Sequence, residues 1–166
     1  MLRVFAFVVA LFSFSAQAME PVEVAPVKFA RASLIIEGVD GPASYDPKAL
    51  EAYGTYAMTT VTPWRPDAAE FVGIRLNDLL AKHGLDAVDA IRVIAENDYA
   101  ITIPNQVWSD NDVLVATRVN GRGHSRRARG PIQFIYNMSK DPSVGVETFQ
   151  KNWVWMAARI EVAEPD

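Results

Sequence analysis

Four arginines lie within eight positions of the chain, in the stretch RGHSRRARGPIQFIY at residues 122–136. They are Arg122, Arg126, Arg127 and Arg129. Gly123, Gly130 and Pro131 bracket this cluster, so the backbone can bend there and approach a ligand closely. Guanidinium groups donate hydrogen bonds to carboxylate, phosphate and carbonyl oxygens, and they stack on aromatic rings. In a chain of formal net charge −4, such a local cluster predicts one wall of a site for a small anionic or polar ligand.

Other polar and aromatic side chains stand where strands are expected to end. The candidates are Thr60, Thr62 and Trp64 after one strand, Asn97, Asp98 and Tyr99 between two others, and Trp155 near the C-terminus. The Asn-Asp pair also fits an ordinary tight turn. Trp153 and Trp155 are two positions apart, so they are expected on one side of a strand, with at least one in the core. With the arginines, these residue types suit a planar heteroaromatic ligand, held by stacking and by hydrogen bonds at its edge.

The composition argues against several other kinds of site. The chain has no cysteine, so it has neither thiolate nucleophiles nor thiolate metal ligands. Its two histidines, His83 and His124, are too few for a zinc or iron centre. His124 and Ser125 are adjacent, and sequence neighbours rarely face each other as a catalytic pair. The mild acidity argues against a nucleic-acid partner.

The N-terminus has the pattern of an export signal. Arg3 precedes the apolar run VFAFVVALF, and Ala16 and Ala18 form a small-x-small cleavage pattern. The apolar run is shorter than the roughly 20 residues that span a bilayer. We therefore expect residues 1–18 to be a signal peptide cleaved after Ala18, and the mature protein to be periplasmic and not inserted in the membrane. Residues 19–32 are expected to form an extended lead-in, and residues 33–166 a single domain.

The elements that must position the candidate residues mix strands and short helices without regular alternation, which predicts an α+β fold. Strands are expected over residues 33–38, 55–62, 89–97, 98–104, 112–123, 131–138 and 153–164. Helices are expected over 46–53, which starts with an Asp-Pro cap, and over 74–84, with leucines on one face and Gly84 at its end. Residues 63–70 contain two prolines and are expected to form a loop, and 143–152 to hold one helical turn.

Five stretches resemble, in their order and spacing, the oxidoreductase molybdopterin-binding domain, which has the sulfite-oxidase-like fold. They are TTVTPW, FVGIRLNDLLAKHG, NDYAITIP, VATRVNG…RGPIQFIYNM and WVWMAARIEV. The resemblance covers about residues 33–162, is greater to small exported members of the family, and implies a mixed β-sheet roll with short helices. Enzymes of the family hold molybdenum through pterin sulfurs and one protein cysteine. This chain lacks the cysteine, so the resemblance implies a pterin ligand without molybdenum.

Small cysteine-free members of the family look like pterin-binding proteins. The resemblance therefore implies a periplasmic sensor that binds pterin and the periplasmic region of an inner-membrane enzyme of cyclic-di-GMP signalling. Asp98 or Asn97 would accept from the pterin N–H groups, an arginine would donate to its carbonyl or polar tail, and an aromatic ring would stack on it. The predicted pterin site comprises Thr60, Thr62, Trp64, Asn97, Asp98, Tyr99, Arg126, Arg127, Arg129, Gly130 and Trp155.

Two alternatives remain open at the level of sequence. The first is a molybdopterin-dependent oxidoreductase with a non-cysteine metal ligand, for which Thr60 or Thr62 would supply the oxygen. The second is a cofactor-free interaction module that keeps the fold and fills the pocket with its own side chains.

Overall fold

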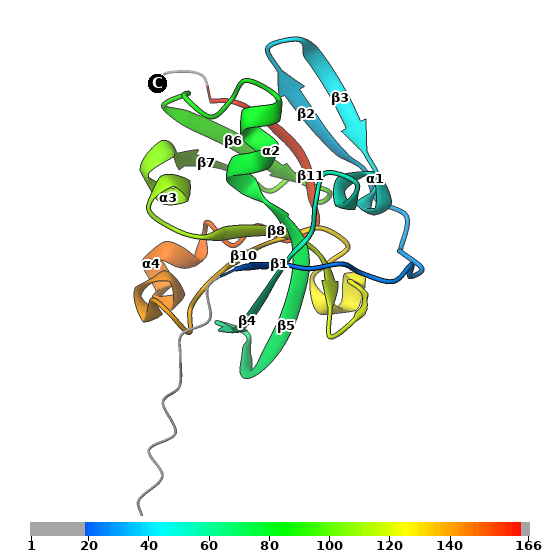
Figure 1. Ribbon diagram of the computed structural model, residues 1–166. Helices are drawn as coiled ribbons and strands as arrows, with labels where there is room; N and C mark the ends of the chain where they lie inside the picture. Colours follow the sequence, from blue (N-terminus) through cyan, green and yellow to red (C-terminus); the bar gives the residue numbers. More distant parts are fainter. Residues whose placement is uncertain (1–18, 164–166) are drawn as a thin grey trace, which may run out of the picture.

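The computed structural model describes residues 19–163 and folds its strands into two sheets (Figure 1). The first sheet is antiparallel throughout, in the order β1-β4-β5-β8-β10, with β9 paired to β8. Its strands are β1 (Glu20–Pro21), β4 (Tyr56–Thr62), β5 (Arg65–Arg75), β8 (Val113–Val119), β9 (Arg122–Gly123) and β10 (Gln133–Tyr136).

The second sheet has the order β3-β2-β11-β6-β7, and only its central β2–β11 pair is parallel. Its strands are β2 (Leu34–Gly38), β3 (Gly41–Tyr45), β6 (Ala90–Ala95), β7 (Ala100–Pro104) and β11 (Ala157–Val162). The α-helices are α1 (Pro47–Glu51), α2 (Leu76–Lys82), α3 (Asn105–Ser109) and α4 (Glu147–Gln150). Two 3-10 helices, η1 (Arg126–Ala128) and η2 (Pro142–Gly145), complete the described elements. This architecture confirms the expected α+β class.

The apolar residues of both sheets and of α2 form one core cluster. The leucines of α2 are fully buried, as their shared face predicts. Strand β10 is buried along its whole length, although it begins with the polar Gln133. Beside it, residues 153–157 run antiparallel to residues 129–134, with Phe134 N bonded to Val154 O at 2.8 Å and Ala157 N bonded to Ile132 O at 2.9 Å. This pairing brings the C-terminal tryptophans next to the end of the arginine loop.

A buried ion pair ties α1 to β8. Arg118 donates to both carboxylate oxygens of Glu51, at 2.7 and 2.6 Å, and the two side chains are only 5% and 9% exposed. The hydroxyl of Thr117 donates to the same carboxylate at 2.6 Å. Arg118 also donates to the carbonyl of Ala25 at 2.7 Å, so the extended segment of residues 19–32 is fastened to the domain by the same group.

Most of the predicted elements are present, and the exceptions have structural reasons. Asp46 caps α1 by accepting from Ala49 N at 2.7 Å, and the Asn120-Gly121 hairpin has the positive φ values, 47° and 70°, that this dipeptide favours. The loop predicted for 63–70 is wrong, because these residues turn at Trp64 and then form the exposed first half of β5. Strand β3 and helix α3 lacked a sequence signal, and the last strand begins at Ala157 instead of 153.

The export signal predicted for residues 1–18 lies outside the described residues. Within residues 19–163, none of the helices is long and apolar enough to cross a membrane.

Candidate functional site

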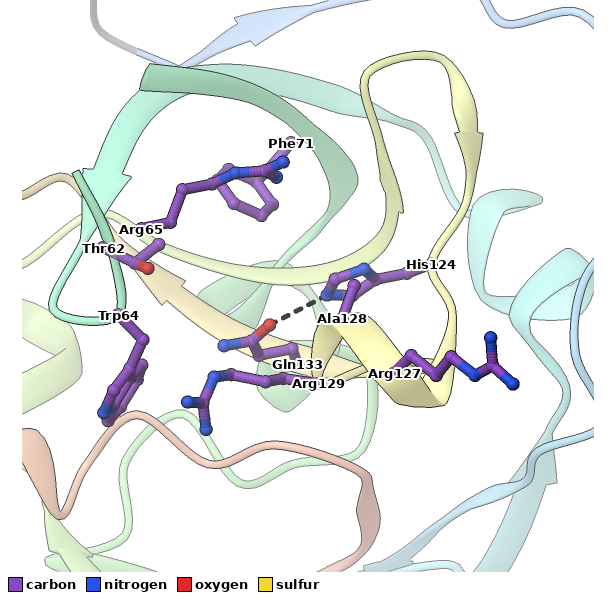
Figure 2. A pocket seen from close by; sticks show the side chains of 9 residues that line it. All are labelled: Thr62, Trp64, Arg65, Phe71, His124, Arg127, Ala128, Arg129 and Gln133. Atoms are coloured by element: carbon purple, nitrogen blue, oxygen red, sulfur yellow. Dashed lines mark hydrogen bonds between the residues drawn. The ribbon is translucent and has the colours of Figure 1, made fainter. Parts of the chain in front are cut away.

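Three segments meet around Trp64 and enclose a cavity of about 320 Å³ (Figure 2). They are the turn between β4 and β5, strand β5 at Phe71, and the arginine loop with the start of β10. We call this space the Arg129 cavity, and its lining residues are Thr62, Trp64, Arg65, Phe71, His124, Arg127, Ala128, Arg129 and Gln133. Three of these residues are arginines and none carries a carboxylate, so the cavity favours ligands that offer hydrogen-bond acceptors.

Arg129 lies at the centre of the site, against two tryptophans. It ends η1 in the left-handed conformation, with φ of 75°, and its carbonyl accepts from Met156 N at 3.2 Å. Its guanidinium carbon is 4.4 Å from the ring centroid of Trp64 and 3.8 Å from that of Trp155. The two rings stack at 5.2 Å with 28° between their planes. Burial lowers the pKa of Arg129, yet a guanidinium keeps its charge in proteins. The Arg129 cation, the two stacked tryptophan rings and the cavity therefore lie next to one another.

His124 and Gln133 form the floor of the Arg129 cavity. Both residues are 2% exposed, and His124 Nε2 lies 2.8 Å from Gln133 Oε1 (dashed in Figure 2). Gly130 packs on the imidazole so closely that a Cβ there would lie 2.6 Å from His124 Cγ. Burial lowers the pKa of His124, and the nearby Arg65 lowers it further, while the bond to Gln133 opposes them. The imidazole is therefore neutral at physiological pH.

A second cavity of about 320 Å³ adjoins the first at Trp64. We call it the Tyr99 cavity, and it is lined by Trp64, Asn97, Tyr99, Gln150, Lys151, Trp153 and Trp155. Tyr99 donates from its hydroxyl to the Lys151 carbonyl at 3.0 Å, which holds the β6–β7 turn against the segment after α4. Aromatic side chains form most of the lining of this cavity, and Asn97 adds an amide. The Tyr99 cavity therefore offers stacking surfaces, whereas the Arg129 cavity offers mainly hydrogen-bond donors.

The structure gathers seven of the eleven predicted site residues around these two cavities. Thr62, Trp64, Arg127 and Arg129 line the first, and Trp64, Asn97, Tyr99 and Trp155 line the second. Figure 2 shows, however, that the guanidinium of Arg127 points away from the Arg129 cavity.

The other four predicted residues line neither cavity. Thr60 is fully buried and accepts from Ser139 N at 3.1 Å. Asp98 is exposed in the β6–β7 turn, with φ of 63°, as the turn interpretation predicts. Arg126 is engaged by the Glu96 carboxylate at 2.8 and 3.0 Å and by the Arg31 carbonyl. Gly130 packs against the imidazole of His124, which itself lines the Arg129 cavity.

Five residues that line the Arg129 cavity were missing from the predicted site, namely Arg65, Phe71, His124, Ala128 and Gln133. Three that line the Tyr99 cavity were also missing, namely Gln150, Lys151 and Trp153. Two of the missing residues had a usable signal. Gln133 is the only polar residue in the apolar run from Ile132 to Tyr136, and a polar side chain in a buried strand requires a partner. His124 precedes the arginines within the same loop and is that partner.

The stability of the protein is expected to fall as the pH drops below about 6.5, the ordinary pKa of histidine. Below this pH the unfolded chain takes up a proton at His124, which the buried imidazole resists, so protonation favours unfolding. Urea unfolding of the wild type and of His124→Phe at about pH 7.5 and about pH 5.5 measures this effect. The variant should lose less stability between the two pH values. The pKa of His83 is also lowered by burial, so His83 contributes to the pH dependence in the same direction. His83→Phe measures that contribution separately. Equal losses in wild type and His124→Phe would contradict the prediction.

The donor set does not fit a molybdenum centre that is held by a protein thiolate. The sequence has no cysteine to supply the thiolate, and within residues 19–163 no group of three or more histidine and carboxylate side chains is placed to hold a metal ion. The fit to a flat organic ring is better, because stacked tryptophans, an arginine and the buried amide of Gln133 stand together.

Comparison with known proteins supports the fold. Neither family models nor curated proteins give a match to the sequence. Among solved structures, the protein is similar to the sulfane dehydrogenase SoxCD from Paracoccus pantotrophus, with a TM-score of 0.58 and 18% identity. The match covers 81% of this chain and 38% of that chain, so the protein spans well under half the length of this neighbour. The sulfite-oxidase-like fold expected from the sequence is thus confirmed.

Proposed function

We propose that this protein binds a pterin and carries out no molybdenum chemistry. The observation that carries the proposal is the contact of Arg129 with Trp64 and Trp155 at the edge of a cavity lined by hydrogen-bond donors. Stacked aromatic rings bind flat heterocycles, and a guanidinium both stacks and donates to carbonyl oxygen. The similarity to a sulfite-oxidase-like structure supports a ligand of the pterin type.

The two cavities complement the two edges of a pterin ring. The carbonyl edge would face the Arg129 cavity, where Arg129 and the amide of Gln133 are available donors. The amino edge would face the Tyr99 cavity, where Asn97 supplies an amide oxygen. Trp64 lines both cavities and would stack on the face of the pterin ring. Arg129 lies against this tryptophan pair, so the guanidinium must shift to the ring edge when a ligand stacks.

The proposal extends to a sensor role in the periplasm. The export pattern at residues 1–18 and the resemblance to small exported pterin-binding proteins support it. The partner would be the periplasmic region of an inner-membrane enzyme of cyclic-di-GMP signalling, regulated by pterin occupancy. Cell fractionation followed by crosslinking with and without added pterin tests this role. Recovery of the uncleaved chain from the cytoplasm would contradict it.

One observation favours a second candidate, the cofactor-free interaction module. The guanidinium of Arg129 already contacts the stacked rings of Trp64 and Trp155. The aromatic surface that would bind a ligand ring is therefore partly covered by the protein itself. The two candidates differ in a direct binding measurement.

A Trp64→Ala variant should bind reduced pterin about ten- to a hundredfold more weakly than the wild type, because stacking of a heterocycle on an aromatic ring is worth about 1–3 kcal/mol. Anaerobic calorimetric titration with tetrahydropterin measures the affinity. Tyr53→Ala is the matched control, since Tyr53 is also an exposed aromatic, 43% accessible, but lines neither cavity. Equal affinity of wild type and Trp64→Ala would place the ligand elsewhere, and no binding at all would favour the interaction module.

A further inference from the structure

The hydrogen bond between His124 and Gln133 determines what the floor of the Arg129 cavity offers to a ligand. An amide has an oxygen that accepts and a nitrogen that donates, and the two ends are exchanged by a half-turn of the group. Whichever end faces His124, the other end is left for the cavity. Figure 2 shows the amide nitrogen of Gln133 on the side of Trp64 and the Arg129 guanidinium, with the oxygen toward His124.

The surroundings of the imidazole select this orientation. His124 Nδ1 is buried, and within residues 19–163 it has no hydrogen-bond partner. If the amide were reversed, Nε2 would have to accept, and the ring proton would move to Nδ1, where it would be a buried donor without an acceptor. Such orphaned donors are rare and costly in proteins. With the proton on Nε2, only a lone pair is left unpartnered at Nδ1, and Gln133 Oε1 must face the imidazole.

The packing around His124 keeps this arrangement in place. Gly130 leaves no room for the ring to retreat, since even a methyl group on its Cα would overlap Cγ of the imidazole. The Phe71 ring lies edge-on to the imidazole, with 6.2 Å between the two ring centroids. Among the described residues no other hydrogen-bond partner is found for the Gln133 side chain, so its nitrogen is free to serve a ligand.

We infer that His124 is a positioning residue that holds the Gln133 amide nitrogen toward the cavity, so that the site selects rings with a carbonyl acceptor at this point over rings with an amino donor. This inference rests on the proposed function, because it assigns a selectivity to the same site. For pteridines it means preference for a 4-oxo ring, as in pterin, over the 4-amino ring of 2,4-diaminopteridine, which would set a donor against a donor.

The test is the ratio of the affinities for pterin and 2,4-diaminopteridine, measured by calorimetric titration. The wild type should prefer pterin by about tenfold or more, the factor expected when a buried polar group is left unpaired. Gln133→Glu replaces the donor with an acceptor and should reverse the preference. His124→Phe removes the Nε2 proton, frees the amide to turn, and should move the ratio toward one, with the donor of Arg129 still in place. Gln106→Glu makes the same chemical change at an exposed position of α3, away from both cavities, and should leave the ratio unchanged.

A Gln133→Glu variant that keeps the wild-type preference would overturn the inference, and so would a folded His124→Phe variant with an unchanged ratio. If His124→Phe does not fold, nitrogen NMR of the wild-type imidazole decides. A proton on Nε2 and none on Nδ1 at neutral pH supports the positioning role, and the opposite tautomer refutes it. Binding of neither ring to the wild type would instead reject the proposed function, while the NMR result would still decide how His124 orients Gln133.

Discussion

Replacing Glu51 with alanine is expected to lower the free energy of unfolding by about 3–5 kcal/mol, because it leaves a buried arginine without its counter-charge. The Arg118 side chain is 5% exposed and donates to both oxygens of Glu51. Its remaining contacts would be the Ala25 carbonyl and the Phe29 ring, which carry no counter-charge. The loss should also loosen residues 19–32, since the same guanidinium holds them. Urea unfolding measures the change, and limited proteolysis reports on the N-terminal segment.

The control removes both charges at once. Glu51→Leu combined with Arg118→Met fills the same space with apolar side chains and leaves no unpaired charge. Replacement of a whole buried ion pair in this way is often close to neutral. The double variant should therefore be clearly more stable than Glu51→Ala. A double variant as unstable as the single one would show that the charge imbalance is not the cause.

Gly73→Ala is expected to cost more than about 4 kcal/mol or to prevent folding, an effect found only where a substitution disrupts the core. A Cβ at this position would lie 2.0 Å from Val115 O and 2.7 Å from Ala116 Cα. These are backbone atoms of β8, and the pairing of β5 with β8 shifts register between Val72 and Gly73. Neither strand can move aside without breaking the centre of the first sheet. Soluble yield and the urea midpoint measure the loss.

Gly54→Ala is the matched control for this prediction. Gly54 has open space where a Cβ would point, but its φ of 106° strains any other residue. That strain is worth about 1–3 kcal/mol, so this variant should fold and be less damaged than Gly73→Ala. If the two variants lost equal stability, backbone strain rather than the strand contact would explain the effect at Gly73.

Much of the fold could be predicted from local sequence patterns. The leucine face of α2, the cap of α1 and the Asn120-Gly121 hairpin depend on residues close together in the chain, and all are present. The requirement for glycine at position 73 could not be predicted, because it arises from the approach of a strand more than 40 residues away. The first half of β5 was missed because Pro66 and the exposed residues around it carry no apolar alternation.

The candidate site was predicted in part for similar reasons. Trp64, Asn97 and Tyr99 lie at strand ends, where turns expose side chains, and they do meet at one cavity. Thr60 and Thr62 look equivalent in sequence and both are buried, but only Thr62 lines a cavity, while the hydroxyl of Thr60 accepts from Ser139 N.

The choice among the arginines could not be made from the sequence. It depends on Glu96, which occupies Arg126, and on the tryptophans, which lie against Arg129. All three contacts join residues far apart in the chain, so no local pattern reveals them.

The most direct test of the central claim is the ligand content of the protein purified anaerobically from the periplasm. Denatured protein would be oxidised and its supernatant assayed for pterin by fluorescence and mass spectrometry, with molybdenum measured on the same sample. We expect pterin close to one per chain and no molybdenum. Stoichiometric molybdenum would identify an enzyme instead, and the absence of pterin, together with no binding of added reduced pterin, would contradict the account.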